Sequence, residues 1–199
     1  MPEQTAVPQG DPADCEPRRT STPVILIDLV EDAGDWTAFG DTEGLKLLVH
    51  NAADAVAGAR AIAVRLPASG RTVEAVVALS SDAEVAILNG LYRGKKKPTN
   101  VLSFPAPATA LAPSGNSGPM PLGDIVLAAE TVLAEAADMG IAPADHLRHL
   151  IVHGLLHLLG YDHIEAAQAD EMEALETRIL ATMGIADPYA SSDPADVVP

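Results

Sequence analysis

The chain has 199 residues, which corresponds to one domain and leaves little room for two. It carries 12 basic and 28 acidic residues, and the net charge of −16 disfavours contact with phosphate backbones except through a local basic patch. Aromatic residues make up only 3% of the chain, which argues against a nucleic-acid binder built mainly on stacking platforms.

The first 22 residues are polar and rich in proline, so we expect a disordered N-terminal arm over residues 1–22. They contain no apolar segment typical of a secretory signal, and no run along the chain approaches the roughly 20 apolar residues of a membrane helix. The single cysteine, Cys15, allows no intramolecular disulfide and no thiolate zinc cluster. These features predict a cytoplasmic protein with no membrane partner.

The structured domain is expected over residues 23–186, followed by a disordered C-terminal tail over 187–199. Apolar patterning and capping residues predict its elements. In chain order they are strand 23–30, helix 42–58, strands 59–66 and 72–79, helix 81–91, strands 99–104 and 123–129, and helices 130–139, 143–159 and 165–183.

Two connections stand out in this order. Residues Ala68–Gly70 indicate a hairpin turn between two strands, and the Pro/Gly/Ser-rich segment 105–121 indicates a long loop. We interpret that loop as an insertion rather than a lid. The pattern as a whole predicts a single α+β domain with a mixed, mostly antiparallel sheet packed with helices.

Five of the six histidines lie between His146 and His163. His153 and His157 are four residues apart, so on a helix their side chains lie on one face, one turn apart. Gly160 permits a sharp turn after the helix, and His163 follows three residues later. Three neutral imidazoles plus a water are the ligands of a catalytic zinc site, in which zinc lowers the pKa of the water to roughly 7. We therefore predict one zinc ion per chain, bound by His153, His157 and His163.

The spacing matches the metzincin signature H-E-x-x-H-x-x-G-x-x-H except at one position. Gly154 stands in the place of the glutamate that is the general base of those proteases. The ligand set of a metzincin-like metal helix is present while the adjacent base is missing, which favours metal binding and disfavours peptidase chemistry. For His146 and His149, which lie on nearly the same helical face, we expect supporting or surface roles rather than ligation.

A second candidate feature is a cationic strip before the strand at 99–104. It places four of the twelve basic residues within five positions: Arg93, Lys95, Lys96 and Lys97. A guanidinium can hold a phosphate through two hydrogen bonds, whereas lysines act as point charges. Against the acidic background, so compact a strip indicates contact with an anionic partner.

Three segments of the chain form a recognisable set: LNGLYRGKKKPTNVLSFP from Leu88, LGDIVL from Leu122, and HLIVHGLLHLLGYDHIEAAQADEMEALE from His149. Together they resemble the YbeY family, the bacterial single-domain, metal-dependent endoribonucleases of ribosomal RNA maturation. The resemblance covers about residues 23–189. It implies the same three-histidine zinc site and a functional arginine at Arg93.

The resemblance further implies a single-strand-specific endoribonuclease that matures the 3′ end of small-subunit ribosomal RNA and acts in ribosome quality control. Ribosomal RNA would be the substrate, and the partners would be a small-subunit ribosomal protein and a ribosome-assembly GTPase. On this basis we assign Arg93 to catalysis and Lys95 and Lys97 to substrate binding. The chain departs from the family at Lys96 and Asn100, where the family often has aspartate.

Two alternatives stay open at this point. A metzincin-like zinc metallopeptidase is favoured by the ligand spacing and disfavoured by Gly154. A non-catalytic ribosome-assembly factor with structural zinc would normally need a fourth protein ligand, for which Asp162 is a candidate.

Overall fold

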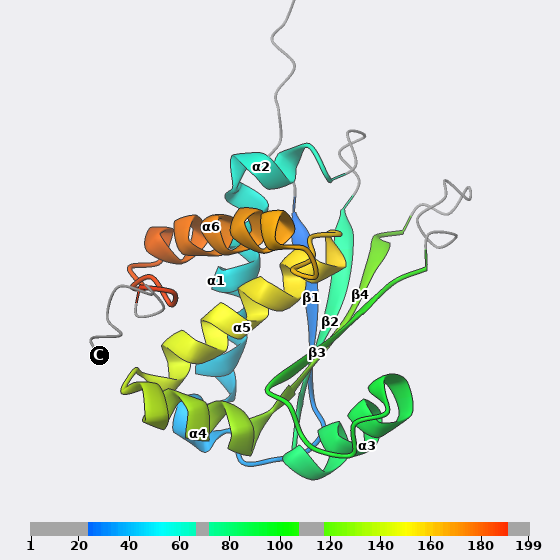
Figure 1. Cartoon of the computed structure of the whole chain (residues 1–199), viewed down its shortest axis with the longest axis vertical. Helices are drawn as coiled ribbons and strands as arrows, with labels where there is room; N and C mark the ends of the chain where they lie inside the picture. The colour runs from blue at the N-terminus through cyan, green and yellow to red at the C-terminus, as the bar shows by residue number, and fades with distance from the viewer. Residues whose placement is uncertain (1–23, 67–71, 108–117, 191–199) are drawn as a thin grey trace, which may run out of the picture.

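The computed structural model describes residues 24–66, 72–107 and 118–190. Within these ranges the chain forms a four-stranded sheet and six α-helices, so the predicted α+β class is confirmed (Figure 1). The elements are β1 (Ile25–Glu31), a 3₁₀ turn (Thr37–Phe39), α1 (Thr42–Gly58), α2 (Arg60–Ala63), β2 (Val73–Ser80), α3 (Asp82–Arg93), β3 (Val101–Pro105), β4 (Met120–Ala128), α4 (Ala129–Met139), α5 (Pro143–Leu158) and α6 (Ala166–Thr182).

The strand order in the sheet is β1-β2-β4-β3. β1 pairs parallel with β2, β2 pairs parallel with β4, and β3 runs antiparallel to β4 at the edge. The sheet is mixed as predicted, but the prediction that it is mostly antiparallel was wrong. Parallel neighbours need a long crossover instead of a tight turn, and α1 and α2 lie within the crossover from β1 to β2.

The predicted strand at 59–66 was also wrong, because this segment contains α2. Ile62 and Leu66, four residues apart, are buried, whereas Val64 between them is 84% exposed. Burial at a spacing of four is typical of a helical turn, and alanine, the strongest helix former, fills three of the eight positions. The predicted hairpin turn at Ala68–Gly70 lies outside the described residues.

The remaining predicted strands and helices are confirmed to within a few residues. α3 runs two residues further than expected, which makes Arg93 its last residue. The predicted loop at 105–121 belongs to the connection between the antiparallel neighbours β3 and β4, and its residues 108–117 lie outside the described ranges.

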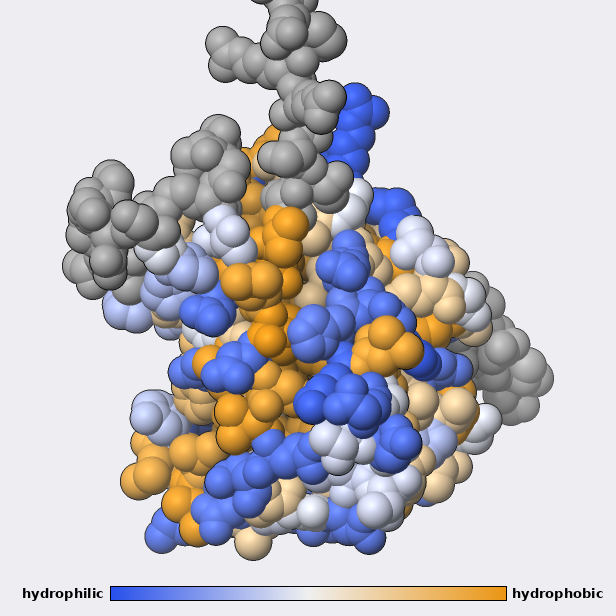
Figure 2. Space-filling model, turned by 180° about the vertical axis from the view of Figure 1, so that it is seen from behind, coloured by the Kyte–Doolittle hydropathy of each residue, from blue (hydrophilic) through white to orange (hydrophobic). Residues whose placement is uncertain are grey.

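Helices α1, α4, α5 and α6 lie on one side of the sheet, and α3 packs on the other (Figure 1). The main core lies between the sheet and the first group, where Leu79, Ile125 and Leu155 are fully buried. The opposite face is more open: Leu26 and Val30 of β1 are each 41% exposed, and Figure 2 shows apolar side chains across that side. None of the helices in the described ranges has the length and apolar composition of a membrane-spanning helix.

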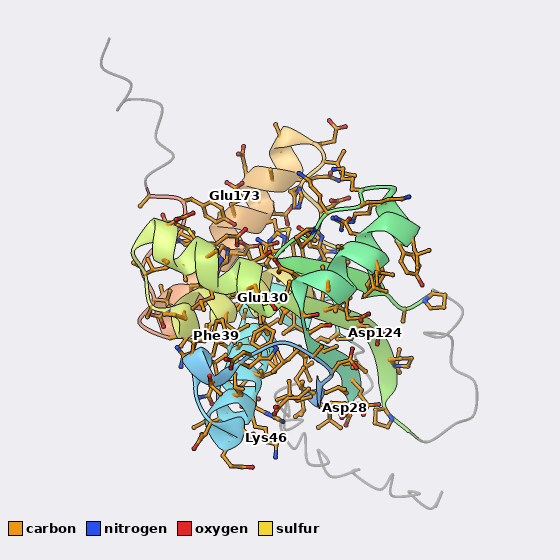
Figure 3. All side chains as sticks on the ribbon, turned by 90° about the horizontal axis from the view of Figure 1, so that it is seen from below. Asp28, Phe39, Lys46, Asp124, Glu130 and Glu173 are labelled. Carbon is orange, nitrogen blue, oxygen red and sulfur yellow. The ribbon has the colours of Figure 1, made fainter. Side chains whose placement is uncertain are left out.

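The start of α3 is tied to the start of α4. The Asp82 carboxylate accepts hydrogen bonds from the backbone N–H and the hydroxyl of Thr131, at 3.0 and 2.8 Å. In return, the Glu130 carboxylate accepts the backbone N–H of Asp82 at 2.8 Å (Figure 3). Each acidic side chain caps the first turn of the other helix, where unpaired N–H groups attract negative charge. This reciprocal capping fixes the base of the helix that carries Arg93.

Candidate active site

The three histidines predicted to bind metal lie together at the end of α5 and in the turn that follows. One ligand nitrogen from each of His153, His157 and His163 lies within 4.8 Å of the other two. Their ring centroids are 4.6, 5.0 and 5.5 Å apart. His153 and His157 are half-buried and His163 is exposed, so the cluster opens to solvent on one side.

A sharp turn brings His163 back towards the helix. Gly160 has a φ of +85°, in the left-handed region that favours glycine. Its N–H donates to the carbonyl of His157, and the N–H of Tyr161 donates to the carbonyl of Leu156. These two bonds form a Schellman motif, which ends the helix and reverses the chain. The hinge that the sequence indicated at Gly160 is therefore present.

Arg65, far from this turn in sequence, holds it from outside. Its guanidinium carbon lies 3.9 Å from the centre of the Tyr161 ring, a cation–π contact. The same side chain donates to the carbonyl of Leu159 at 3.3 Å. A cation at the carboxyl end of a helix also offsets the negative end of the helix dipole.

The Nδ1 atoms of the two helical histidines face acceptors. His153 Nδ1 lies 2.8 Å from Glu176 Oε1, and His157 Nδ1 lies 3.0 Å from the carbonyl oxygen of Tyr161. Each acceptor requires hydrogen on Nδ1, so each neutral ring has its lone pair at Nε2. The two Nε2 atoms are 3.0 Å apart, near the ~3.3 Å between two ligands of a tetrahedral zinc ion. Two lone pairs at this distance repel unless a cation lies between them, so the donor set fits a metal.

Glu176 of α6 is fully buried behind this cluster. Its carboxylate accepts from His153 Nδ1, from His149 Nε2 at 3.1 Å, and from the hydroxyl of Tyr189. Burial alone would raise the pKa of Glu176, but the hydrogen bonds from His149, His153 and Tyr189 and the charge of His153 outweigh it and lower the pKa to about 2. Glu176 is therefore ionised at neutral pH and fixes the ring orientation of His153.

The segment after α6 makes side-chain contacts as far as Tyr189, beyond the point where the sequence predicted a disordered tail. The C-terminal tail was expected to begin at Asp187, yet the Asp187 carboxylate accepts from the hydroxyl of Thr177 and the N–H of Tyr189, at 3.0 and 2.9 Å. The Tyr189 ring packs against His149, with centroids 5.8 Å apart. Burial raises the pKa of the Tyr189 hydroxyl, and the hydrogen bond to Glu176 and the charge of Glu176 raise it further. The hydroxyl therefore stays protonated and donates to Glu176.

Burial also lowers the pKa of two imidazoles of α5, those of His157 and His146. The pKa of His157 is lowered by burial first and then by the charges of His153 and His163, which keeps its ring available as a ligand. Burial likewise lowers the pKa of His146, whose Nε2 lies 2.8 Å from a carboxylate oxygen of Glu135. His146 and His149 thus contact carboxylates and lie outside the ligand group, as expected.

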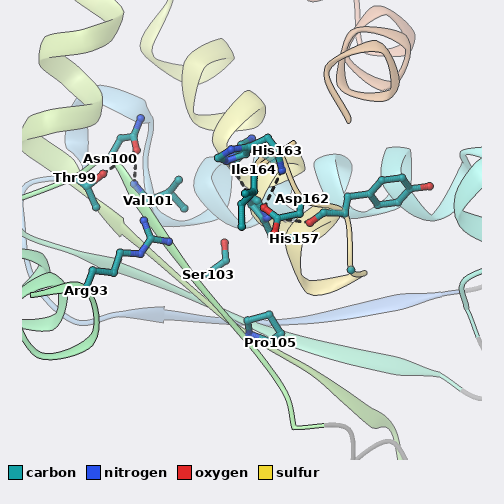
Figure 4. A pocket seen from close by; sticks show the side chains of 13 residues that line it. Arg93, Thr99, Asn100, Val101, Ser103, Pro105, His157, Asp162, His163 and Ile164 are labelled. Atoms are coloured by element: carbon teal, nitrogen blue, oxygen red, sulfur yellow. Dashed lines mark hydrogen bonds between the residues drawn. The ribbon is translucent and has the colours of Figure 1, made fainter. Parts of the chain in front are cut away.

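The histidine cluster forms one wall of a cleft of about 620 Å³ (Figure 4). The opposite wall consists of the edge strand β3, which presents Ser103 and Pro105, and the end of α3. Arg93 extends from α3 into this cleft, and Figure 4 shows its guanidinium directed towards Val101. Among the described residues the guanidinium has no hydrogen-bonded or ionic partner. An unpartnered guanidinium opposite a set of metal ligands is suited to binding a phosphate.

The structure separates the members of the cationic strip. Arg93 lines the cleft, whereas Lys95, Lys96 and Lys97 are exposed and, in the part of the chain that the structure describes, stand outside its lining. The buried side chain of Asn89 holds the strip by donating from Nδ2 to the backbone carbonyl of Lys97 at 2.8 Å, and the backbone carbonyl of Asn89 accepts the N–H of Lys95 at 3.2 Å. The assignment of Lys95 and Lys97 to substrate binding stays a prediction.

Asn100, one of the departures from the family pattern, also lines the cleft. Its Oδ1 accepts the N–H of Val101 at 2.7 Å, and its Nδ2 donates to Glu135 at 3.0 Å. An aspartate here would bring a second carboxylate against Glu135, which destabilises both charges. The amide is therefore matched to the neighbour that this chain carries.

The geometry at Gly154 and Asp162 bears on the two alternatives. A Cβ on Gly154 would lie 2.9 Å from the side chain of Ile125, so this position faces β4 and a base there could not reach the cleft without displacing the core. The Asp162 carboxylate accepts the N–H of His163 at 2.8 Å. Within the described residues the group of possible ligands contains the three histidines and not Asp162. The described part of the chain therefore supplies three protein ligands and not the four that are typical of structural zinc.

Sequence analysis did not single out Glu176, Arg65 or Tyr189. A signal for Glu176 was present, because it follows Met172 by four residues and precedes Ile179 by three, in the apolar stripe of α6. A carboxylate in such a stripe must be paired when the helix packs. No local pattern distinguishes Arg65 or Tyr189, whose contacts depend on tertiary structure.

Comparison with known proteins shows which family the sequence matches. Residues 40–184 match the family described as Endoribonuclease YbeY. The Endoribonuclease YbeY of Parvibaculum lavamentivorans is 46% identical over 180 residues, covering 88% of this chain and 91% of that protein. The Endoribonuclease YbeY of Rhodospirillum rubrum is 51% identical over 160 residues, covering 80% and 78%. A solution structure from Thermotoga maritima shares 21% identity, with a TM-score of 0.48, over 88% of this chain and 100% of that one.

Proposed function

The chain belongs to the YbeY family of endoribonucleases, and on that premise we propose that it is a zinc-dependent endoribonuclease that cleaves single-stranded ribosomal RNA. The observation that carries the proposal is the cleft, which brings three convergent imidazoles and one unpartnered guanidinium together. The first group can hold a metal ion and the second can hold a phosphate. Together they suit a metal-dependent cleavage of a phosphodiester, in which charge develops on the phosphate oxygens.

His153, His157 and His163 would hold the zinc ion, one per chain. When bound there, zinc supplies Lewis-acid chemistry towards a phosphoryl oxygen. The chain's own contribution is to fix the ligands: Glu176 and the carbonyl of Tyr161 keep hydrogen on the Nδ1 atoms and leave Nε2 of His153 and His157 as the donors.

Arg93 would act on the reacting phosphate from the opposite wall. Its guanidinium can donate two parallel hydrogen bonds to phosphate oxygens and offset the charge that develops on them in the transition state. The capping bonds to α4 fix the first turn of α3 and so the backbone of the helix that Arg93 ends, while its side chain, without a partner among the described residues, is free to meet a phosphate. This is the basis for its assignment to catalysis.

The proposal extends to the biological setting that the family resemblance implied. The substrate would be the 3′ end of small-subunit ribosomal RNA, with a role in ribosome quality control in the cytoplasm. A small-subunit ribosomal protein and a ribosome-assembly GTPase would be the partners. Support for this part comes from the three sequence segments that resemble the family.

A two-substrate assay tests the function directly. Purified protein is incubated with ribosomal RNA that contains single-stranded segments and, separately, with unfolded casein, each with and without a chelator and with zinc added back. We expect cleavage of RNA alone, lost with the chelator and restored by zinc. Cleavage of casein alone would support the metallopeptidase alternative, and cleavage of neither would support the non-catalytic assembly factor.

A further inference from the structure

The end of α3 exposes an aromatic ring beside the cleft. All six aromatic residues of the chain lie within the described ranges, and Tyr92 is the most exposed of them, at 68%. By contrast, Trp36, Phe39 and Tyr161 are 5 to 7% exposed. In a chain with so few aromatic residues, a solvent-exposed ring next to the arginine assigned to catalysis is a candidate position for ligand contact.

The Tyr92 ring is supported from beneath. It packs against Phe104 of β3, with centroids 4.9 Å apart and ring planes inclined by 60°. Phe104 in turn packs on the small core under α3, which contains Val85 and Leu102. One side of the tyrosine is thus held while the other faces solvent. A held ring loses little conformational freedom when a flat ligand stacks on it.

The edge strand links this ring to the cleft. Successive residues of a strand point to opposite faces, so Ser103 and Pro105 face the cleft while Phe104 faces α3 and lies under Tyr92. β3 is the last strand of the sheet in the described structure. A chain bound at Arg93 can therefore pass over the β3 edge and reach the tyrosine.

The charge around this path favours RNA as the occupant. Lys95, Lys96 and Lys97 follow Arg93 after a single glycine, in a chain whose net charge is −16. Cationic side chains that track a phosphate backbone, with an aromatic ring on which a base stacks, are the two components of single-strand nucleic-acid binding sites. A protein partner, by contrast, would be expected to cover the neighbouring exposed apolar residues Ile87 and Leu91 as well.

We propose that Tyr92 is a base-stacking position for single-stranded RNA whose neighbouring phosphate lies at Arg93. This inference rests on the proposed function and adds to it the place where the substrate leaves the cleft. It also accounts for single-strand specificity, because a base paired in a duplex presents no open face to the ring.

The test pairs substitutions at Tyr92 with RNA that lacks one base. Single-turnover cleavage by the zinc-loaded protein, measured over a range of RNA concentrations, gives the half-saturating concentration and the maximal rate. Tyr92→Ala should raise the half-saturating concentration by about 5-fold or more, the effect of losing one stacked base, and leave the maximal rate unchanged. Tyr92→Trp should bind as wild type.

Abasic nucleotides, placed at one position at a time along the RNA, identify the stacked base. One abasic position should weaken binding to wild type and cause no further loss with Tyr92→Ala, because the same contact is already absent. Tyr92→Leu keeps apolar cover over Phe104 without an aromatic face, so its binding should resemble that of Tyr92→Ala even if the alanine variant unfolds. Leu91→Ala, at a neighbouring exposed apolar residue, is the matched control and should bind as wild type.

The inference is overturned if Tyr92→Leu binds RNA as wild type, if the abasic and protein losses add fully, or if Leu91→Ala causes the same loss. The last result would indicate a general apolar surface that suits a protein partner. Failure of the proposed function is a separate outcome: chelator-sensitive cleavage would then be absent, whereas direct titration of a labelled RNA with wild type and with Tyr92→Leu would still show binding that depends on Tyr92.

Discussion

The two walls of the cleft are held in different ways. On the histidine wall, His153 and His157 each have a fixed acceptor at Nδ1, and the buried Glu176 has three donors. On the opposite wall, Arg93 has no partner among the described residues and the lysines of the cationic strip are exposed. Fixed donors suit a metal ion that must stay bound, whereas unpartnered cations suit a substrate that must bind and leave.

The largest effect is expected on the histidine wall. His157→Ala should remove most bound zinc and abolish metal-dependent cleavage, because two imidazoles cannot hold the ion tightly. Metal analysis of the purified variant checks this. His50→Ala is the matched control, since His50 is exposed on α1 and its Nδ1 bonds to the carbonyl of Lys46. Full zinc occupancy in His157→Ala would end the assignment.

The next effect is expected across the cleft. Arg93→Ala should lower the single-turnover rate by about 100-fold or more, the effect of losing one transition-state donor. Arg93→Lys should recover little, because a point charge does not replace two parallel hydrogen bonds. Zinc content and thermal stability should stay near wild type for both. A wild-type rate for Arg93→Ala at saturating RNA would make Arg93 a binding residue only.

Glu176 tests whether the support behind the histidines matters. Glu176→Gln should weaken zinc affinity by about 10- to 100-fold, as for other losses of a carboxylate that orients a metal-binding histidine. Competition with a chromophoric chelator measures this affinity. An unchanged affinity would mean that Glu176 contributes to packing and not to ligand orientation.

The same carboxylate predicts a pH dependence of stability. The pKa of Glu176 falls from 4.5 to about 2 on folding, so its stabilising contribution is present above pH 4.5 and is lost as the pH falls towards 2. The metal-free wild type should therefore exceed Glu176→Gln in unfolding free energy at pH 6 by about 3 kcal/mol. Denaturant unfolding at a series of pH values should show this difference shrinking below pH 4.5. A constant difference would contradict the account.

The smallest effects are expected from the lysines. Lys95→Ala and Lys97→Ala should each weaken RNA binding a few-fold and reduce the salt dependence of binding by about one counterion per lysine. Both maximal rates should equal that of wild type, because these side chains lie outside the cleft lining. Binding measured at several salt concentrations checks this, and a lower rate at saturation would bring a lysine into the reaction.

The sequence predicted the histidine wall better than it predicted the sheet. Ligand spacing along one helix and the glycine after it are local features. The relative positions of the ligands therefore follow from the short segment between His153 and His163. The pairing of β1 with β2 depends on chain connections, and residues 59–66 contain the β-branched Ile62 and Val64, which also suit a strand. The choice there was made by tertiary burial of Ile62 and Leu66.

The support of the site was beyond the reach of local patterns. Arg65 reaches the turn after α5 from nearly a hundred positions earlier in the chain, and Tyr189 reaches Glu176 from a segment that was expected to be a disordered tail. Such contacts exist only once α1, α5 and α6 have packed. Tyr92 likewise could not be singled out from local sequence, because its position depends on packing against Phe104 at the edge of the sheet.

A zinc titration shows whether the three histidines hold a catalytic metal. Protein stripped of metal by a chelator is mixed with increasing zinc, and single-turnover cleavage of single-stranded ribosomal RNA is measured at each addition. We expect no cleavage by the stripped protein and a rate that rises linearly and levels off at one zinc per chain. Cleavage at the full rate by the stripped protein, or a plateau at another stoichiometry, would contradict a single catalytic zinc at the three histidines.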